Sequence, residues 1–170
     1  LAALVAAAGL EIRCLVEPFR YDPDSFLTDP RLRERTAGLD PVQRAALAEA
    51  VAGNMGIHIA YCVRAGEQPA APAWEDMESV PVLRELDGAK LAATIPADGV
   101  LRIAFDGLTA PVALPRLAQA ILARVDGRRS IGAIGDELAE KGVSRELYAK
   151  DFAAVARAME RVNRMLLAAR

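Results

Sequence analysis

The side chains best suited to acid–base chemistry are few in this chain of 170 residues. His58 is its single histidine. An imidazole acts as a general base when a nucleophile or an orienting carboxylate lies beside it, and the sequence around His58 supplies neither. The alternative is a strand histidine with satisfied hydrogen bonds, and the local sequence favours that alternative.

Three of the chain's few aromatic residues lie close together in one predicted loop. Phe19, Tyr21 and Phe26 fall within FRYDPDSFLTDPRLRERTAG, among turn-forming proline and aspartate residues. Aromatic side chains in a loop can line the mouth of a substrate pocket. They can also hold the loop down on a core, which is the more common arrangement.

The cysteines argue against a metal site. Cys14 and Cys62 are far apart and lack CxxC spacing, which with one histidine disfavours zinc and suggests a reducing, cytoplasmic compartment. The apolar start, LAALVAAAGL, lacks a methionine and a basic segment, so we interpret it as an amphipathic helix of a longer protein and not as a signal peptide. No apolar run reaches the roughly 20 residues that a membrane span needs, so we expect no membrane partner.

The stretch that organises the first part of the chain is DPVQRAALAEAVAGNMGIHIAYCVRA, residues 40–65. Asp40 and Gln43 predict a capping box at a helix that Gly53 ends. Residues 57–63 are apolar and rich in β-branched side chains, which predicts a strand covered on both faces. Residues 10–17 alternate apolar and charged side chains and predict a half-buried strand.

Residues 67–79 are rich in proline, alanine and acidic side chains, which predicts a linker that Trp74 pins to a domain surface. The linker separates a domain over residues 1–66 from one over residues 80–170. In the second domain, Asp106-Gly107 lies between two apolar segments and predicts a β-hairpin.

Three helices follow the predicted hairpin: residues 115–125, a helix capped by Ser130, and a helix capped by Ser144 that runs nearly to Arg170. The last helix has apolar residues at alternating spacings of four and three: Tyr148, Phe152, Val155, Met159, Val162 and Leu166. This stripe predicts a long core helix, with a coiled-coil homodimer contact as the alternative. The expected fold class is therefore α+β and predominantly helical.

The net charge of −2 hides an asymmetry between the two ends of the chain. Residues 1–114 carry 10 basic and 16 acidic side chains, whereas residues 115–170 carry 11 basic and 7 acidic ones. A basic region can bind nucleic acid. The acidic residues interspersed among these arginines make a solvated surface the simpler interpretation.

The first 65 residues resemble the C-terminal end of bacterial class I S-adenosylmethionine-dependent methyltransferases. The resemblance is carried by AGL at residues 8–10, FRYDPDSFLTDPRLRER, and QRAALAEAVAGN followed by HIAYCVRA at residues 58–65. It implies an antiparallel strand pair with a helical insertion between the strands. It also implies a tail of the kind called a methyltransferase regulatory region.

A second stretch, LPRLAQAILARVDGRRSIGAIGDELA at residues 114–139, resembles the winged-helix extension of such proteins. Its segment DGRRSIG is similar to the turn in small peptide-recognising winged domains. The resemblance implies a winged-helix-like accessory domain with a β-hairpin and a long C-terminal helix.

The cofactor site of that family depends on a glycine-rich loop after the first strand and an acidic residue after the second. The glycines of this chain are scattered at predicted caps and turns, so S-adenosylmethionine is expected for the parent protein and no cofactor for this part of it. Methyl transfer depends on alignment of donor and acceptor more than on acid–base groups. Side-chain type therefore nominates no catalytic residue.

The resemblance implies an accessory or regulatory region that shapes or caps substrate access, is inactive alone, and has its own catalytic domain and a protein or peptide substrate as partners. The residues expected to face the methyl acceptor are Phe19, Tyr21, Phe26, Asn54 and His58. The alternative functions are a nucleic-acid-binding winged helix and a dimerisation module. Nucleic acid is disfavoured because the helix after Ser130 is rich in acidic residues.

Overall fold

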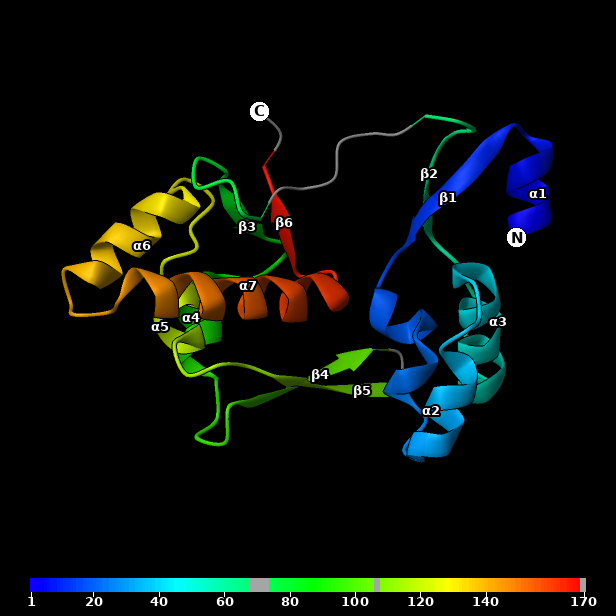
Figure 1. The fold of residues 1–170 in the computed structure, drawn as a ribbon, viewed down its shortest axis with the longest axis horizontal. Helices are drawn as coiled ribbons and strands as arrows, with labels where there is room; N and C mark the ends of the chain where they lie inside the picture. Colours follow the sequence, from blue (N-terminus) through cyan, green and yellow to red (C-terminus); the bar gives the residue numbers. More distant parts are fainter. Residues whose placement is uncertain (68–73, 106–107, 169–170) are drawn as a thin grey trace. The chain divides into compact units, whose positions relative to one another are not determined.

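The computed structural model describes residues 1–67, 74–105 and 108–168. For residues 105, 108 and 110 it describes the backbone alone. The chain divides into two compact units, Leu1–Ala70 and Ala71–Arg170. The division falls inside residues 67–79, the segment predicted as a linker, of which residues 68–73 lie outside the described residues. The fold class is α+β and predominantly helical, as predicted, with small antiparallel strand pairs (Figure 1).

The first unit contains one strand pair and a set of short helices (Figure 1). In chain order its elements are α1 (Ala2–Ala7), β1 (Leu10–Leu15), the 3-10 turns η1 (Pro18–Tyr21) and η2 (Pro23–Ser25), α2 (Pro30–Thr36), α3 (Pro41–Ala52) and β2 (Ala60–Arg64). Both helices α2 and α3 begin with a proline after an aspartate cap, as predicted.

Helix α3 has the capping box that the sequence predicts. The Asp40 carboxylate accepts hydrogen bonds from the backbone N–H groups of Val42 and Gln43, and the Gln43 side chain accepts from the Asp40 N–H. These bonds satisfy donors that a helix N-terminus otherwise leaves unpaired. Gly53 ends the helix in the left-handed conformation (φ 67°), which glycine adopts without steric cost.

Strands β1 and β2 pair antiparallel, with Leu10 opposite Arg64 and Leu15 opposite Ala60. A bulge between Ile12 and Cys14 shifts the register. The predicted strand over residues 57–63 is shorter in the structure, but the pairing extends one step further because the Val16 N–H donates to the Ile59 carbonyl at 2.8 Å.

The prediction that residues 57–63 are covered on both faces is wrong within this unit. Ile59 and Tyr61 share one face of the paired segment and are each 61% exposed, and Ile57, just ahead of that segment, is 75% exposed. On the opposite face, Ile12 and Leu15 are partly buried and line a pocket. The result is an apolar strip, Ile57–Ile59–Tyr61, open to solvent.

The second unit contains two strand pairs and four helices among its described residues: β3 (Pro81–Leu83), α4 (Gly88–Ala93), β4 (Val100–Phe105), β5 (Leu108–Ala113), α5 (Ala118–Leu122), α6 (Ile131–Ala139), α7 (Arg145–Arg161) and β6 (Met165–Leu167). Strands β4 and β5 form the predicted antiparallel hairpin. Its turn, Asp106-Gly107, lies outside the described residues. The hairpin precedes helices α5, α6 and α7, and the winged-helix assignment remains a prediction.

The core of the second unit lies where α7 packs against α5 and α6. Its fully buried side chains are branched aliphatics and methionine, including Ile121, Leu122, Ile131, Ile134, Val155 and Met159. The predicted helix over residues 115–125 is shorter, because the N–H groups of Arg124 and Val125 bond three residues back and tighten its end into a 3-10 turn.

The final helix does not run nearly to Arg170; it ends at Arg161. Asn163 is left-handed (φ 53°) and donates its N–H to the Glu160 carbonyl, while the Arg164 N–H reaches back to Met159. These two bonds form a Schellman motif, which stops a helix by satisfying its last carbonyl groups. Strand β6 follows and pairs antiparallel with β3.

The apolar stripe of α7 belongs to the core of its own unit. Tyr148, Phe152, Val155, Met159 and Val162 are all at most 4% exposed. A coiled coil would require these side chains on a free helix face, so this stripe is not available to a second copy of the chain. No helix in the described part of the chain combines the length and apolarity of a membrane span.

Trp74 packs against the core of the second unit, as predicted for the end of the linker. Its ring centroid lies 6.4 Å from that of Phe152. The segment after Trp74 is also attached to the second unit, at the start of α6. The carbonyls of Met77 and Ser79 accept hydrogen bonds from the N–H groups of Gly132 and Ile131.

Gly88→Ala is expected to destabilise the second unit by about 3 kcal/mol, because the added methyl group would collide with the backbone carbonyl oxygens of Leu122 and Val125. Trp74, the only tryptophan, reports on this unit by fluorescence during urea unfolding. The control Gly56→Ala meets no atom within 4 Å and should change the midpoint little. Equal midpoints for the two variants would contradict the packing of α4 on α5.

Candidate functional site

The aromatic loop of the first unit is held against α3 by Arg44. Its guanidinium lies 2.8 Å from the Asp22 carboxylate and 3.1 Å from that of Asp24, and it donates to the Thr36 carbonyl at 3.0 Å. Charge-assisted bonds of this kind are stronger than neutral ones. They fix η1 and η2 and therefore fix the position of Tyr21.

A pocket of about 390 Å³ lies in the first unit between α1, β1, η1 and α3. Its walls are mainly aliphatic and include Ile12, Leu15, Val42 and Ala45. The polar residues Tyr21, Glu49 and His58 form the remaining part of its lining. A concave apolar site with a few convergent polar groups is the usual form of a small-molecule site.

The three polar residues form a chain across the pocket wall. The Tyr21 hydroxyl lies 3.1 Å from His58 Nδ1, and His58 Nε2 lies 3.3 Å from Glu49 Oε1. A proton on Nε2 faces the carboxylate and leaves the Nδ1 lone pair to accept from the Tyr21 hydroxyl. We call this arrangement the Tyr21–His58–Glu49 chain.

The order of groups in this chain is carboxylate, imidazole, hydroxyl. In acid–base sites of this order the carboxylate orients the imidazole, and the imidazole takes the proton of the hydroxyl. Burial raises the pKa of Tyr21, and the nearby Glu49 and Glu17 charges add to the rise while Arg20 opposes it. The phenol is therefore protonated at neutral pH and can donate to Nδ1 of an imidazole that carries its proton on Nε2.

The structure separates the five predicted site residues. Tyr21 and His58 meet in the pocket, 37 positions apart in sequence. Phe19 and Phe26 pack on each other with ring centroids 6.0 Å apart and do not line the pocket, so they hold the loop down. Asn54 is exposed beyond the end of α3 and is also outside the pocket lining.

Glu49 is the residue that sequence reasoning missed. It supplies the carboxylate that the sequence around His58 lacks. The only signal was its position four residues after Ala45 on α3, on the face that packs inward. That spacing indicates a shared face but gives no reason to pair Glu49 with a particular strand residue.

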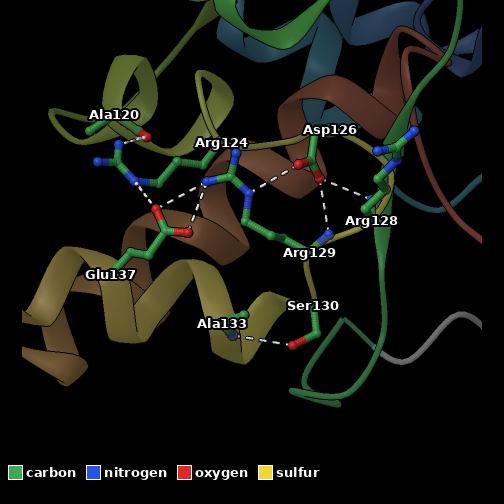
Figure 2. A network of polar contacts seen from close by, with 8 residues as sticks. All are labelled: Ala120, Arg124, Asp126, Arg128, Arg129, Ser130, Ala133 and Glu137. Atoms are coloured by element: carbon green, nitrogen blue, oxygen red, sulfur yellow. Dashed lines mark hydrogen bonds and ion pairs between the residues drawn. The ribbon is translucent and has the colours of Figure 1, made fainter.

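The segment DGRRSIG takes part in a polar network that joins α5 to α6 (Figure 2). Asp126 Oδ1 accepts the N–H groups of Arg128 and Arg129, and Oδ2 accepts from Arg129 Nε. Arg129 Nη1 reaches both oxygens of Glu137, which also accepts from Arg124 Nε. The turn thus fixes the start of α6.

This network bears on the charge asymmetry of the chain. Arg124 and Arg129 are paired with the acidic Glu137 within the second unit. A phosphate backbone would have to compete with that carboxylate for both guanidinium groups. The structure thus adds no specific support for a nucleic-acid interface at this turn.

The described residues contain no group of three His, Cys, Asp or Glu side chains that could hold a metal. The strands in the described ranges pair only antiparallel, and no glycine-rich turn joins a strand to a following helix.

No protein-family model matches this chain, and no curated protein matches its sequence.

Arg44→Met is expected to loosen the aromatic loop and to destabilise the first unit by about 2 kcal/mol, because it removes the ion pairs to Asp22 and Asp24 and the hydrogen bond to the Thr36 carbonyl. His58 is the single histidine, so its ring resonances in an NMR spectrum report on the unit directly. The exposed Arg31→Met serves as the matched control. An unchanged His58 environment in the Arg44 variant would show that the loop is positioned by other contacts.

Asp126 makes stability of the second unit depend on pH. Hydrogen bonds from the backbone N–H groups of Arg129 and Arg128 lower the pKa of Asp126 to about 2. Because this value is below that of the unfolded chain, the stabilisation is present above about pH 4 and is lost as the pH falls toward 2.

Asp126→Asn should therefore lower the free energy of unfolding by about 1 kcal/mol at pH 7, a value reduced for the partial exposure of this carboxylate. The difference from the wild type should shrink toward zero at pH 2, measured by Trp74 fluorescence in urea. Asp136→Asn changes a carboxylate in a highly exposed ion pair and should have little effect at any pH. A pH-independent difference for the Asp126 variant would exclude this linkage.

Proposed function

We propose that this chain is the C-terminal accessory region of a cytoplasmic S-adenosylmethionine-dependent methyltransferase. It shapes or caps the substrate side of the catalytic domain and does not transfer a methyl group alone. Its partners are that catalytic domain and a methyl-accepting substrate, with a protein or peptide among the candidates. The winged-helix-like second unit is part of the same accessory region.

The observation that carries the proposal is the β1–β2 pair. One face of the pair closes the pocket through Ile12 and Leu15, while the opposite face presents the apolar strip Ile57–Ile59–Tyr61. A two-stranded sheet is marginally stable by itself, and an alternating row of exposed apolar side chains is a site for packing against another element. A catalytic domain that covers this strip would place the pocket at its border.

The proposal predicts that the strip becomes protected in the longer polypeptide encoded by the same reading frame. Amide hydrogen exchange over residues 57–64 should be slower there than in residues 1–170 alone. Tyr61→Asp should leave the isolated chain folded, since Tyr61 is 61% exposed, yet restore fast exchange in the longer polypeptide. Arg64→Gln, at the exposed end of the same strand, is the control.

Calorimetric titration of residues 1–170 with S-adenosylmethionine should give no binding heat. Tight binding by this chain would overturn the accessory role, because it would place a complete donor site within it. Equal exchange rates in the short and long polypeptides, or a longer polypeptide that lacks a methyltransferase domain, would contradict the proposal as well.

A further inference from the structure

We propose that the pocket of the first unit binds a small, uncharged and mainly apolar ligand with one hydroxyl group, and that the Tyr21–His58–Glu49 chain receives the proton of that hydroxyl. The pocket and the Tyr21–His58–Glu49 chain both lie within residues 1–67. The inference rests on the proposed function in one respect, that the ligand is a substrate of the attached enzyme.

The volume and the wall residues of the pocket determine the size and the polarity of the ligand. A volume of about 390 Å³ is at the small end of the range for small-molecule sites. Ile12, Leu15 and Val42 offer no hydrogen-bonding side chains, so a ligand body in contact with them gains most if it is apolar. A peptide backbone would leave its polar groups unpaired against these walls.

The polar part of the lining sets the functional group of the ligand. When the His58 proton is on Nε2, facing Glu49, the Tyr21 hydroxyl donates to Nδ1, and its oxygen remains an acceptor that selects a hydrogen-bond donor on the ligand. Glu49 places a negative charge at the same wall, which disfavours a carboxylate or phosphate ligand. A neutral hydroxyl satisfies both conditions.

The proton path follows from the geometry. The ligand O–H proton passes to Tyr21 Oη as the Tyr21 proton passes to His58 Nδ1. The ligand oxygen then carries the negative charge, Tyr21 is neutral again, and the imidazolium is balanced by Glu49, 3.3 Å from Nε2. One proton leaves the ligand and one is gained by His58, so no further reactant is needed.

Two probes distinguish this site from a nonspecific apolar pocket. 2-Naphthol has an apolar body and one hydroxyl, and 2-methoxynaphthalene has the same body with the hydrogen of that hydroxyl replaced. In fluorescence titrations of residues 1–170, 2-naphthol should bind saturably and about fivefold more tightly than its methyl ether, the usual effect of one hydrogen bond. Its addition should also shift the His58 ring resonances.

The variants locate the interaction. Tyr21→Phe keeps the ring and removes the hydroxyl, so the two probes should bind equally well to it. Glu49→Gln should retain binding but abolish the shift of the His58 resonances that 2-naphthol causes. Arg64→Gln, remote from the pocket lining, should match the wild type. Circular dichroism spectra that match the wild type would verify that each variant is folded.

Equal binding of both probes to the wild-type chain, absence of 2-naphthol binding, or an undiminished preference in Tyr21→Phe would overturn the inference. These titrations use the isolated chain and do not depend on an attached catalytic domain. The exchange experiment on residues 57–64 tests the contact with that domain separately. Failure of the ligand-site proposal can therefore be distinguished from failure of the proposed accessory function.

Discussion

The constraint on which the structure depends is that its described strands occur only as pairs. A pair of strands has two faces and two edges, and it persists only where other elements cover an apolar face. In the second unit, β3 and β6 meet this condition because Leu83 and Met165 lie in the helical core. In the first unit the β1–β2 pair is covered on one face only. The covered face forms a wall of the pocket, and Ile57, Ile59 and Tyr61 remain exposed.

The same arrangement explains how three side chains of modest individual reactivity come together. Arg44 ties the loop that carries Tyr21 to α3, and α3 itself carries Glu49. His58 arrives from the other direction, just ahead of β2. Its position is therefore fixed by strand pairing and that of Tyr21 by ion pairs. The site is built from elements rather than from a loop alone, which favours a stable geometry.

Local signals in the sequence predicted most of the helix starts and the β-hairpin of this fold. The caps at Asp40 and Ser144, and the hairpin, depend on neighbours within a few residues and were found correctly. The end of α7 was missed because Asn163 takes the left-handed conformation that glycine usually marks. The Glu49–His58 contact was missed because it joins helix α3 to the segment just ahead of β2, and no sequence spacing specifies that packing. Residues 57–63 were predicted to be covered on both faces because they are apolar and β-branched. Residue type alone does not show whether a second face is covered within the same unit.

Strand β3 has β6 as its partner in the described sheet, and β6 is the last element of the second unit to be synthesised. At translation rates of roughly 5–20 residues per second, β3 waits several seconds on the ribosome with an unpaired edge. Such an edge can pair with other nascent chains. The brevity of Pro81–Leu83, together with a proline at its first position, limits that hazard. The order of synthesis thus gives a reason for a strand of three residues where the unit's hairpin strands have six.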